Sequence, residues 1–109
     1  MGVLKLCTYK KAEYPLYLEM LSLHVYTMEE LCYAMESSLF LLDESWMGTE
    51  FFQWIADGVG NAELAGQLRR LYQRHRDVYE CAAFLFSASG FYSRQEQKEL
   101  ERIIEKMKG

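Results

Sequence analysis

The sequence predicts a mainly α-helical protein, a bundle of about five helices with a short N-terminal β-hairpin or extended arm. Three observations support this fold class. Half of the 109 residues are apolar, which is enough to build a core, and the chain has one proline and no low-complexity run. Two motifs that begin helices, at 27–30 and 93–96, are each followed by apolar residues at helical spacing. The length fits a single domain, with the arm over residues 1–26 and the bundle over 27–109.

The N-terminal arm contains two segments with strand-like patterns. Residues 3–9 are rich in β-branched and aromatic side chains, and residues 20–26 alternate apolar and polar side chains. We expect a turn over 10–15 between them. The hairpin should lie on the helices, because two strands alone are only marginally stable in water. A helix over 16–23 is the alternative interpretation.

The first helix is expected over 28–42. Thr27 and Glu30 form a capping box, in which the hydroxyl and the carboxylate accept hydrogen bonds from amides that lack partners at a helix start. Residues 39–42 are apolar on every side, which predicts that the end of this helix lies in the core. A connection over 43–48 follows.

Four further patterns supply the remaining helices, and the one over 77–88 should lie beside the first helix in the middle of the bundle. Thr49 is expected to cap a short helix that ends near residue 56, before Gly58 and Gly60. The others should each follow a capping side chain: Asn61 before 62–75, Asp77 before a helix through about residue 88, and Ser93 before a helix that runs nearly to Gly109. A final helix so close to the chain end suggests the first module of a longer protein.

Charge is distributed unevenly along the chain. The net charge is −4, yet residues 12–68 contain ten acidic residues and no Lys or Arg, while the remainder contains twelve basic and six acidic residues. Two interpretations are open. The two parts pack together and partly neutralise each other, or they form a dipolar surface that steers a charged partner.

No motif of enzyme chemistry occurs in the sequence. The three cysteines (Cys7, Cys32 and Cys81) and the two histidines have neither metal-ligand spacing nor the local signature of a nucleophile with its base. We interpret the cysteines as reduced core residues of a cytoplasmic protein. The longest purely apolar run, at 81–86, is six residues, too short to span a membrane. We therefore expect no enzyme, no cofactor, no metal site and no membrane association.

Two groups of residues are candidates for partner binding. Arginines are concentrated at the end of the helix over 62–75 and form a solvated or acid-paired face, a protein-binding face or a nucleic-acid site: Arg69, Arg70, Arg74 and Arg76. This helix and the next superficially resemble a helix-turn-helix pair, but phosphate binding generally needs a basic domain and the flanking acids would repel DNA. Aromatic rings are concentrated before them, at Trp46, Phe51, Phe52 and Trp54. Either these rings are shared between the core and the arm, or they form an exposed patch with an acidic rim, which is typical of protein-binding surfaces.

Four segments resemble the N-terminal helical module of uncharacterised clostridial proteins, in which helical or tetratricopeptide-like repeats follow: Pro15–Glu19, Val25–Tyr33, Leu41–Asp43 and Glu63–Leu68. The resemblance covers most of residues 15–104 and contains no catalytic motif. It implies a cytoplasmic bacterial interaction module.

Together these observations predict a non-catalytic protein-interaction or adaptor module that binds a protein partner or a second copy of itself. The residues expected to carry the binding are Trp46, Phe51, Trp54, Arg69, Arg70, Arg74 and Arg76. The alternative is a small nucleic-acid-binding regulator that uses the segment Arg69–Arg76.

Overall fold

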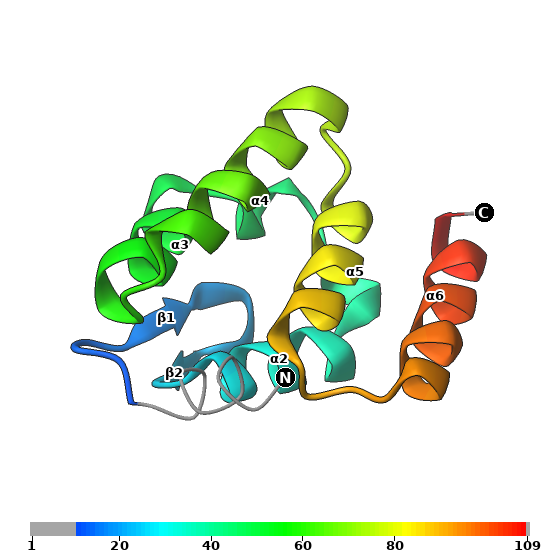
Figure 1. Ribbon diagram of the computed structural model, residues 1–109, viewed down its shortest axis with the longest axis horizontal. Coiled ribbons are helices and arrows are strands. Elements are labelled where there is room, and N and C mark those ends of the chain that lie inside the picture. The colour runs from blue at the N-terminus through cyan, green and yellow to red at the C-terminus, as the bar shows by residue number, and fades with distance from the viewer. Residues whose placement is uncertain (1–10, 109) are drawn as a thin grey trace.

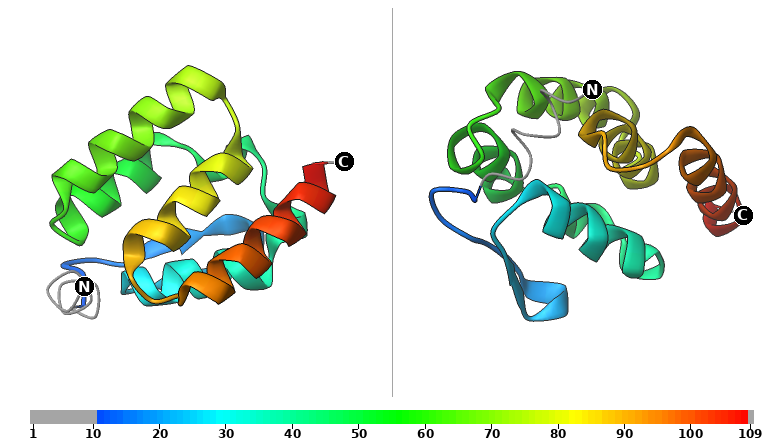
Figure 2. Two further views of the ribbon diagram at one scale, coloured as in Figure 1. Left: turned by 45° about the vertical axis from the view of Figure 1, so that its right-hand side comes forward. Right: turned by 60° about the horizontal axis from the view of Figure 1, so that its bottom comes forward.

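Helix α5 (Val78–Ser89) lies at the centre of the structure, a computed structural model that describes residues 11–108. Three other helices pack against it: α2 (Met28–Ser37), α4 (Ala62–His75) and α6 (Arg94–Lys108). Figure 1 shows α5 between α4 and α6, and Figure 2 shows α6 running alongside α5 at the edge of the molecule. With the short helix α3 (Thr49–Gln53), the described part of the chain has five α-helices and one two-stranded sheet, which confirms the predicted fold class.

The described hairpin begins later in the sequence than predicted. Strand β1 (Leu16–Leu18) pairs antiparallel with β2 (Leu23–Val25), and Leu16 lies opposite Val25. The predicted strand over 20–26 contains β2, whereas the predicted strand over 3–9 lies outside the described residues. The turn between the paired strands is Glu19–Ser22, so its predicted place at 10–15 is wrong.

A single 3₁₀ turn, Glu19–Leu21, and a left-handed Ser22 with φ of 49° reverse the chain between the strands. The alternative helix over 16–23 is therefore reduced to this one turn. Leu16, Leu18 and Val25 are buried against the helices, as a hairpin of only two strands requires.

Helix α2 begins as predicted and ends earlier. The Thr27 Oγ1 accepts a hydrogen bond from the Glu30 amide at 3.0 Å, and the Glu30 carboxylate accepts one from the Tyr26 amide. The helix ends at Ser37, and Ser38 leaves helical geometry with φ of −131°. The prediction of one helix over 28–42 is wrong beyond that point.

A 3₁₀ turn, Leu39–Leu41, replaces the predicted last turn of α2. With three residues per turn, positions 39 and 42 point the same way. Leu39 and Leu42 are buried, whereas Phe40 is 69% and Leu41 39% exposed. The expectation that the whole run lies in the core is correct for two residues and wrong for the other two.

The short helix α3 continues directly into a π-helical turn, Trp54–Gly58. Gly48, and not Thr49, is its N-cap residue, and no side chain caps it. Gly60 follows with φ of 87° and ends the segment, as predicted. A Cβ atom at Gly58 would lie 2.9 Å from the Trp54 indole, so this position needs glycine.

The caps of the last three helices are as predicted. Asn61 Oδ1 accepts from the Leu64 amide at 3.1 Å. Asp77 Oδ1 accepts from the Tyr79 and Glu80 amides at 3.0 and 3.2 Å. Ser93 Oγ accepts from the Glu96 amide at 3.1 Å, and the Glu96 carboxylate accepts from the Ser93 amide at 2.8 Å. Gly90, with φ of 79°, ends α5. Among residues 11–108, no helix combines the length and the apolar character needed to cross a bilayer.

Candidate functional site

The predicted aromatic binding residues lie in the core. Trp46, Phe51 and Trp54 are at most 3% exposed, and Phe52 is also buried. Both indoles have partners, since Trp46 Nε1 donates to the Leu41 carbonyl at 3.0 Å and Trp54 Nε1 donates to the Tyr14 carbonyl at 2.7 Å. The hypothesis of an exposed aromatic patch is wrong, and the rings are shared between the core and the arm.

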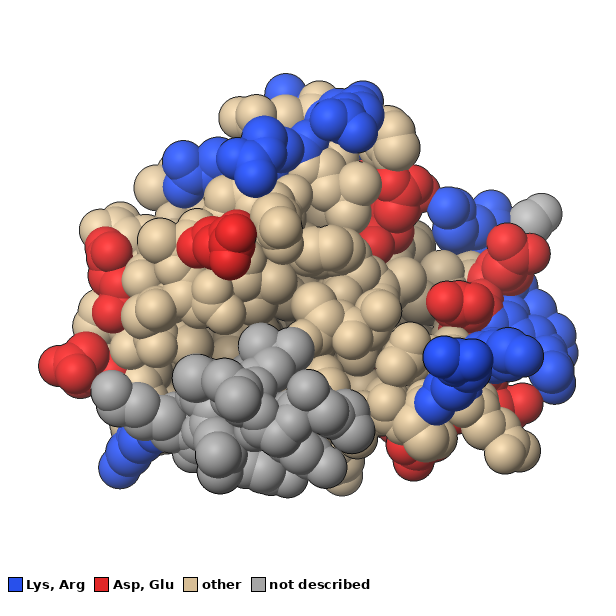
Figure 3. Space-filling view, in the orientation of Figure 1, with Lys and Arg blue, Asp and Glu red and all other residues tan. Residues whose placement is uncertain are grey.

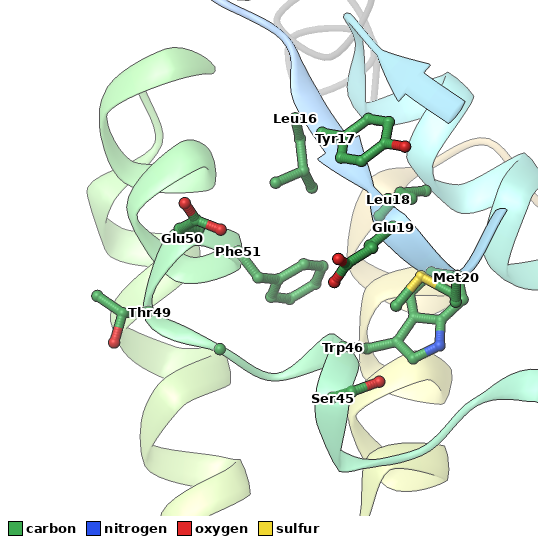
Figure 4. A pocket seen from close by; sticks show the side chains of 11 residues that line it. Leu16, Tyr17, Leu18, Glu19, Met20, Ser45, Trp46, Thr49, Glu50 and Phe51 are labelled. Atoms are coloured by element: carbon green, nitrogen blue, oxygen red, sulfur yellow. The ribbon is translucent and has the colours of Figure 1, made fainter. Parts of the chain in front are cut away.

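The arm covers these rings from one side. Figure 4 shows Phe51 and Trp46 facing the residues of the hairpin. A pocket of about 330 Å³ remains between the hairpin and α3, and its two carboxylates come from Glu19 and Glu50. Among the described residues, no His, Cys, Lys or Arg lines it.

The four candidate arginines form one exposed surface, the arginine face, which consists of Arg69, Arg70, Arg74 and Arg76. Figure 3 shows it as a blue band along α4, with acidic side chains below it and at one side. None of the four makes an ion pair with another residue of 11–108. The ion pairs in that part of the chain are His75–Glu80, Arg102–Glu99 at 3.1 Å and Lys108–Asp77 at 2.7 Å.

The ion pairs of residues 11–108 bear on one part of the charge asymmetry, the direct pairing of the acidic segment with basic residues. Every one joins residues that follow Leu68, and none uses an acid of the segment 12–68. The acidic segment therefore packs against the rest of the protein without a direct ion pair to the arginine face.

The arginine face has two sides. On the side of α3, Arg69 and Arg76 lie at the edge of a cleft of about 320 Å³ whose other lining residues include Thr49, Phe52, Tyr72 and Gln73. On the side of α5, Arg70 and Arg74 line a smaller hollow of about 240 Å³ with Gln67, Leu71 and Phe84. The sequence predicted the four arginines but not this division, because it depends on the packing of α3 against α4.

The two arginines of the cleft lie on aromatic rings. The Arg69 guanidinium carbon is 5.3 Å from the centre of the Phe52 ring, and that of Arg76 is 5.4 Å from the centre of the Tyr72 ring. Both distances are within the range of a cation–π interaction. These contacts restrict the two side chains to the vicinity of the cleft.

The connection after α4 is held by acids of α5. His75 Nδ1 contacts the Glu80 carboxylate, and Asp77 pairs with Lys108 of α6. Partial burial raises the pKa of Asp77, but the hydrogen bonds from Lys108 and from the Glu80 and Tyr79 amides outweigh it and hold that pKa below its usual value. The hydrogen bond to Asp77 in turn raises the pKa of Lys108.

The helix pair α4–α5 is not arranged as a helix-turn-helix. In a helix-turn-helix, the second helix enters the DNA groove. Here the second helix is α5, which is packed between α2, α4 and α6, and most of the α5 side chains are buried or half-buried. Only α4 of the pair presents a basic surface.

The cysteines of the described residues are core side chains, as predicted. Cys32 and Cys81 are buried, and burial raises the pKa of each thiol to about 12. Cys7 lies outside the described residues. Within residues 11–108, no three His, Cys, Asp or Glu side chains gather in a way that could hold a metal ion.

Sequence reasoning missed one surface. An apolar groove of about 460 Å³ runs between β2 and α2, with Leu23 and Tyr33 as its large exposed side chains and Glu29 and Glu30 at its edge. The available signal was Tyr33, which lies off the buried stripe of α2.

Comparisons with protein-family models, with curated proteins and with solved structures return no match. The similarity to the helical module of clostridial proteins therefore remains a prediction from the sequence.

Proposed function

We propose that this protein is a non-catalytic interaction module that binds an acidic protein partner through the arginine face. The observation that carries this proposal is the set of four exposed arginines without an ion pair to any residue of 11–108. Guanidinium groups form bidentate hydrogen bonds with carboxylates and are enriched at interfaces for that reason. A bacterial setting belongs to this proposal through the sequence resemblance alone, and a cytoplasmic setting through that resemblance and the interpretation of the cysteines as reduced.

A second copy of the chain is one partner with suitable charge. Residues 12–68 contain ten acidic residues, and none of them pairs with a Lys, Arg or His of residues 11–108. Sedimentation at low and high salt separates the two cases. Self-association that weakens with salt identifies the second copy, whereas a monomer at every salt concentration points to a different acidic protein.

Nucleic acid is the weaker candidate. Phosphates also accept bidentate hydrogen bonds from arginine, so the arginine face has donors of the right kind. The ten acids of the neighbouring segment oppose it, because a nucleic-acid-binding domain normally carries a basic surface rather than a net negative charge.

The proposal is tested by titrating the protein with an acetylated hexaglutamate peptide and, separately, with a short DNA duplex. We expect the peptide to bind at low salt and to be lost when Arg69, Arg70, Arg74 and Arg76 are all changed to Gln. The matched control changes four basic residues of α6 to Gln, namely Arg94, Lys98, Arg102 and Lys106, which alters the net charge equally. Equal loss in both variants would reduce the effect to net charge and contradict the proposal. Tighter binding of the duplex than of the peptide would favour the nucleic-acid alternative.

A further inference from the structure

Two arginines of the arginine face occupy one edge of the cleft between α3 and α4. Arg69, Tyr72, Gln73 and Arg76 are spaced i, i+3, i+4 and i+7, so they share the side of α4 that faces α3. Thr49 and Phe52 of α3 line the opposite edge. The buried rings of Phe52 and Tyr72 supply apolar surface, and Thr49 and Gln73 supply exposed hydroxyl and amide groups.

The cleft has positive charge without a compensating acid. None of the described residues that line it is Asp or Glu. Neither Arg69 nor Arg76 has an ion-pair partner within residues 11–108. An anion that enters the cleft therefore displaces water and no protein carboxylate.

The two guanidinium groups are partly preorganised. Their positions over the Phe52 and Tyr72 rings, at 5.3 and 5.4 Å, restrict side chains that are otherwise flexible. Less conformational entropy is then lost when an anion binds. Arg70 and Arg74 make no such ring contact among residues 11–108, although Arg70 lies close to Gly66 on its own helix.

The backbone conformation of Arg76 also supports a functional role for this residue. Arg76 is the C-cap of α4 and has φ of 53°, a left-handed conformation in which glycine or asparagine is usual. A long side chain at this position carries a conformational cost, and such cost is often found at functional sites. The Arg76 side chain reaches back over Tyr72 into the cleft.

We propose that the cleft between α3 and α4 is a carboxylate-binding pocket, in which Arg69 and Arg76 hold one Glu or Asp side chain of an acidic protein segment. This inference rests on the proposed function and assigns unequal roles within the arginine face. Arg69 and Arg76 bind the carboxylate, while Arg70 and Arg74 raise the local positive potential.

The experiment compares two double variants with the same change in charge on the same helix. The dissociation constant for acetylated hexaglutamate is measured by NMR titration of the wild-type protein, of Arg69→Gln/Arg76→Gln and of Arg70→Gln/Arg74→Gln. We expect the first variant to bind about tenfold or more weakly, and the second to bind within about threefold of wild type at ~0.15 M salt. In the wild-type titration, the Nε–Hε resonances of Arg69 and Arg76 should shift most.

A conservative pair tests the geometry rather than the charge. Arg69→Lys/Arg76→Lys keeps both positive charges and removes the planar, bidentate donor. We expect it to bind about fivefold more weakly than wild type, between wild type and the Gln pair. If the Lys pair binds hexaglutamate with wild-type affinity, the pocket is wrong and only the positive charge matters.

The remaining outcomes separate this inference from the proposed function. If both Gln pairs weaken binding equally, the arginine face binds the peptide but the pocket is wrong. If the wild-type protein does not bind hexaglutamate even at low salt, both are wrong. In a parallel titration with inorganic phosphate, a shift of the same Arg69 and Arg76 resonances with no response to hexaglutamate would assign the pocket to phosphate and overturn the carboxylate.

Discussion

Asp77 joins three parts of the molecule through one carboxylate. It accepts hydrogen bonds from two amides at the start of α5 and from Lys108 Nζ at the end of α6. Because these bonds outweigh partial burial, the pKa of Asp77 is lower in the folded protein than in the unfolded chain. Its contribution to stability is therefore present above the unfolded pKa and is lost as the pH falls through the folded one.

We expect Asp77→Ala to lower the free energy of unfolding by about 1–2 kcal/mol at neutral pH, the usual effect of removing an N-cap. The difference from wild type should shrink at acid pH, where the wild-type carboxyl is protonated. Urea unfolding across a pH series measures both effects. Asp43→Ala is the matched control, because Asp43 caps only the short 3₁₀ turn Glu44–Trp46 and has no basic partner among residues 11–108. A gap that widens at low pH would contradict the assignment.

The buried cysteines should be unreactive in the folded protein. With a thiol pKa of about 12, only about one in 10⁴ of the Cys32 or Cys81 side chains is thiolate at pH 8, and both are covered by the core. In a Cys7→Ser variant, we expect labelling by a thiol reagent to be slow in buffer and complete in urea. Rapid labelling of either thiol in buffer would show that α2 or α5 opens readily.

Arg76 is expected to exchange stability for binding. Glycine adopts the left-handed conformation at φ of 53° without steric cost, so Arg76→Gly should raise the free energy of unfolding by about 0.5–1 kcal/mol. The same variant should bind hexaglutamate more weakly. Thermal unfolding and the NMR titration measure the two effects, and a variant that loses stability would show that the contact with Tyr72 outweighs the backbone strain.

Among the helices, α5 is the one that packs against three other α-helices. Leu85 is completely buried in it, and the helix contacts α2, α4 and α6. We expect Leu85→Ala to lower the free energy of unfolding by about 2–5 kcal/mol, because a cavity remains where the side chain was. Ile103→Ala on α6 is the control, since Ile103 is 40% exposed and its loss should cost much less. Equal effects of the two changes, measured by urea unfolding, would contradict the central place of α5.

Helix starts were easier to predict than helix ends. A start is encoded by one side chain that accepts amide hydrogen bonds, as Thr27, Asn61, Asp77 and Ser93 do. The end of α2 at Ser37 has no glycine or proline to announce it, so the apolar run after it resembled more helix. The hairpin strands are three residues each, too short for an alternating pattern to fix their register or turn.

The candidate site was predicted only in part, because some of its features depend on tertiary packing and not on the local sequence. Four arginines within eight residues are visible in the sequence, and polar side chains of this length stay exposed. The burial of Trp46, Phe51 and Trp54 depends on the hairpin and on α4 covering α3 from different sides, which no local pattern reports. The cleft at Arg69 and Arg76 depends on the same packing.

Salt should stabilise the fold and weaken binding, because ten acidic residues are concentrated in 12–68 and the arginine face lies outside that segment. The ten acids of 12–68 repel one another without direct relief from a Lys, Arg or His of residues 11–108. We expect the midpoint of thermal unfolding to rise by a few degrees between about 10 and 200 mM NaCl, because the Debye length shortens from about 30 Å to less than 10 Å. Binding of hexaglutamate should weaken over the same range. A midpoint that falls with salt would show that attractive pairs dominate.

The hydrogen bond from the Trp54 indole to the Tyr14 carbonyl has a practical meaning for anyone who divides this chain. A fragment that begins at Thr27, where the sequence marks the boundary between arm and bundle, would lack the hairpin that Phe51 and Trp46 face. The rings of Phe51 and Trp46 would be exposed to solvent in this fragment, and we expect it to aggregate. Residues 11–26 are therefore part of the folded unit, because they shield apolar side chains of the helices from solvent.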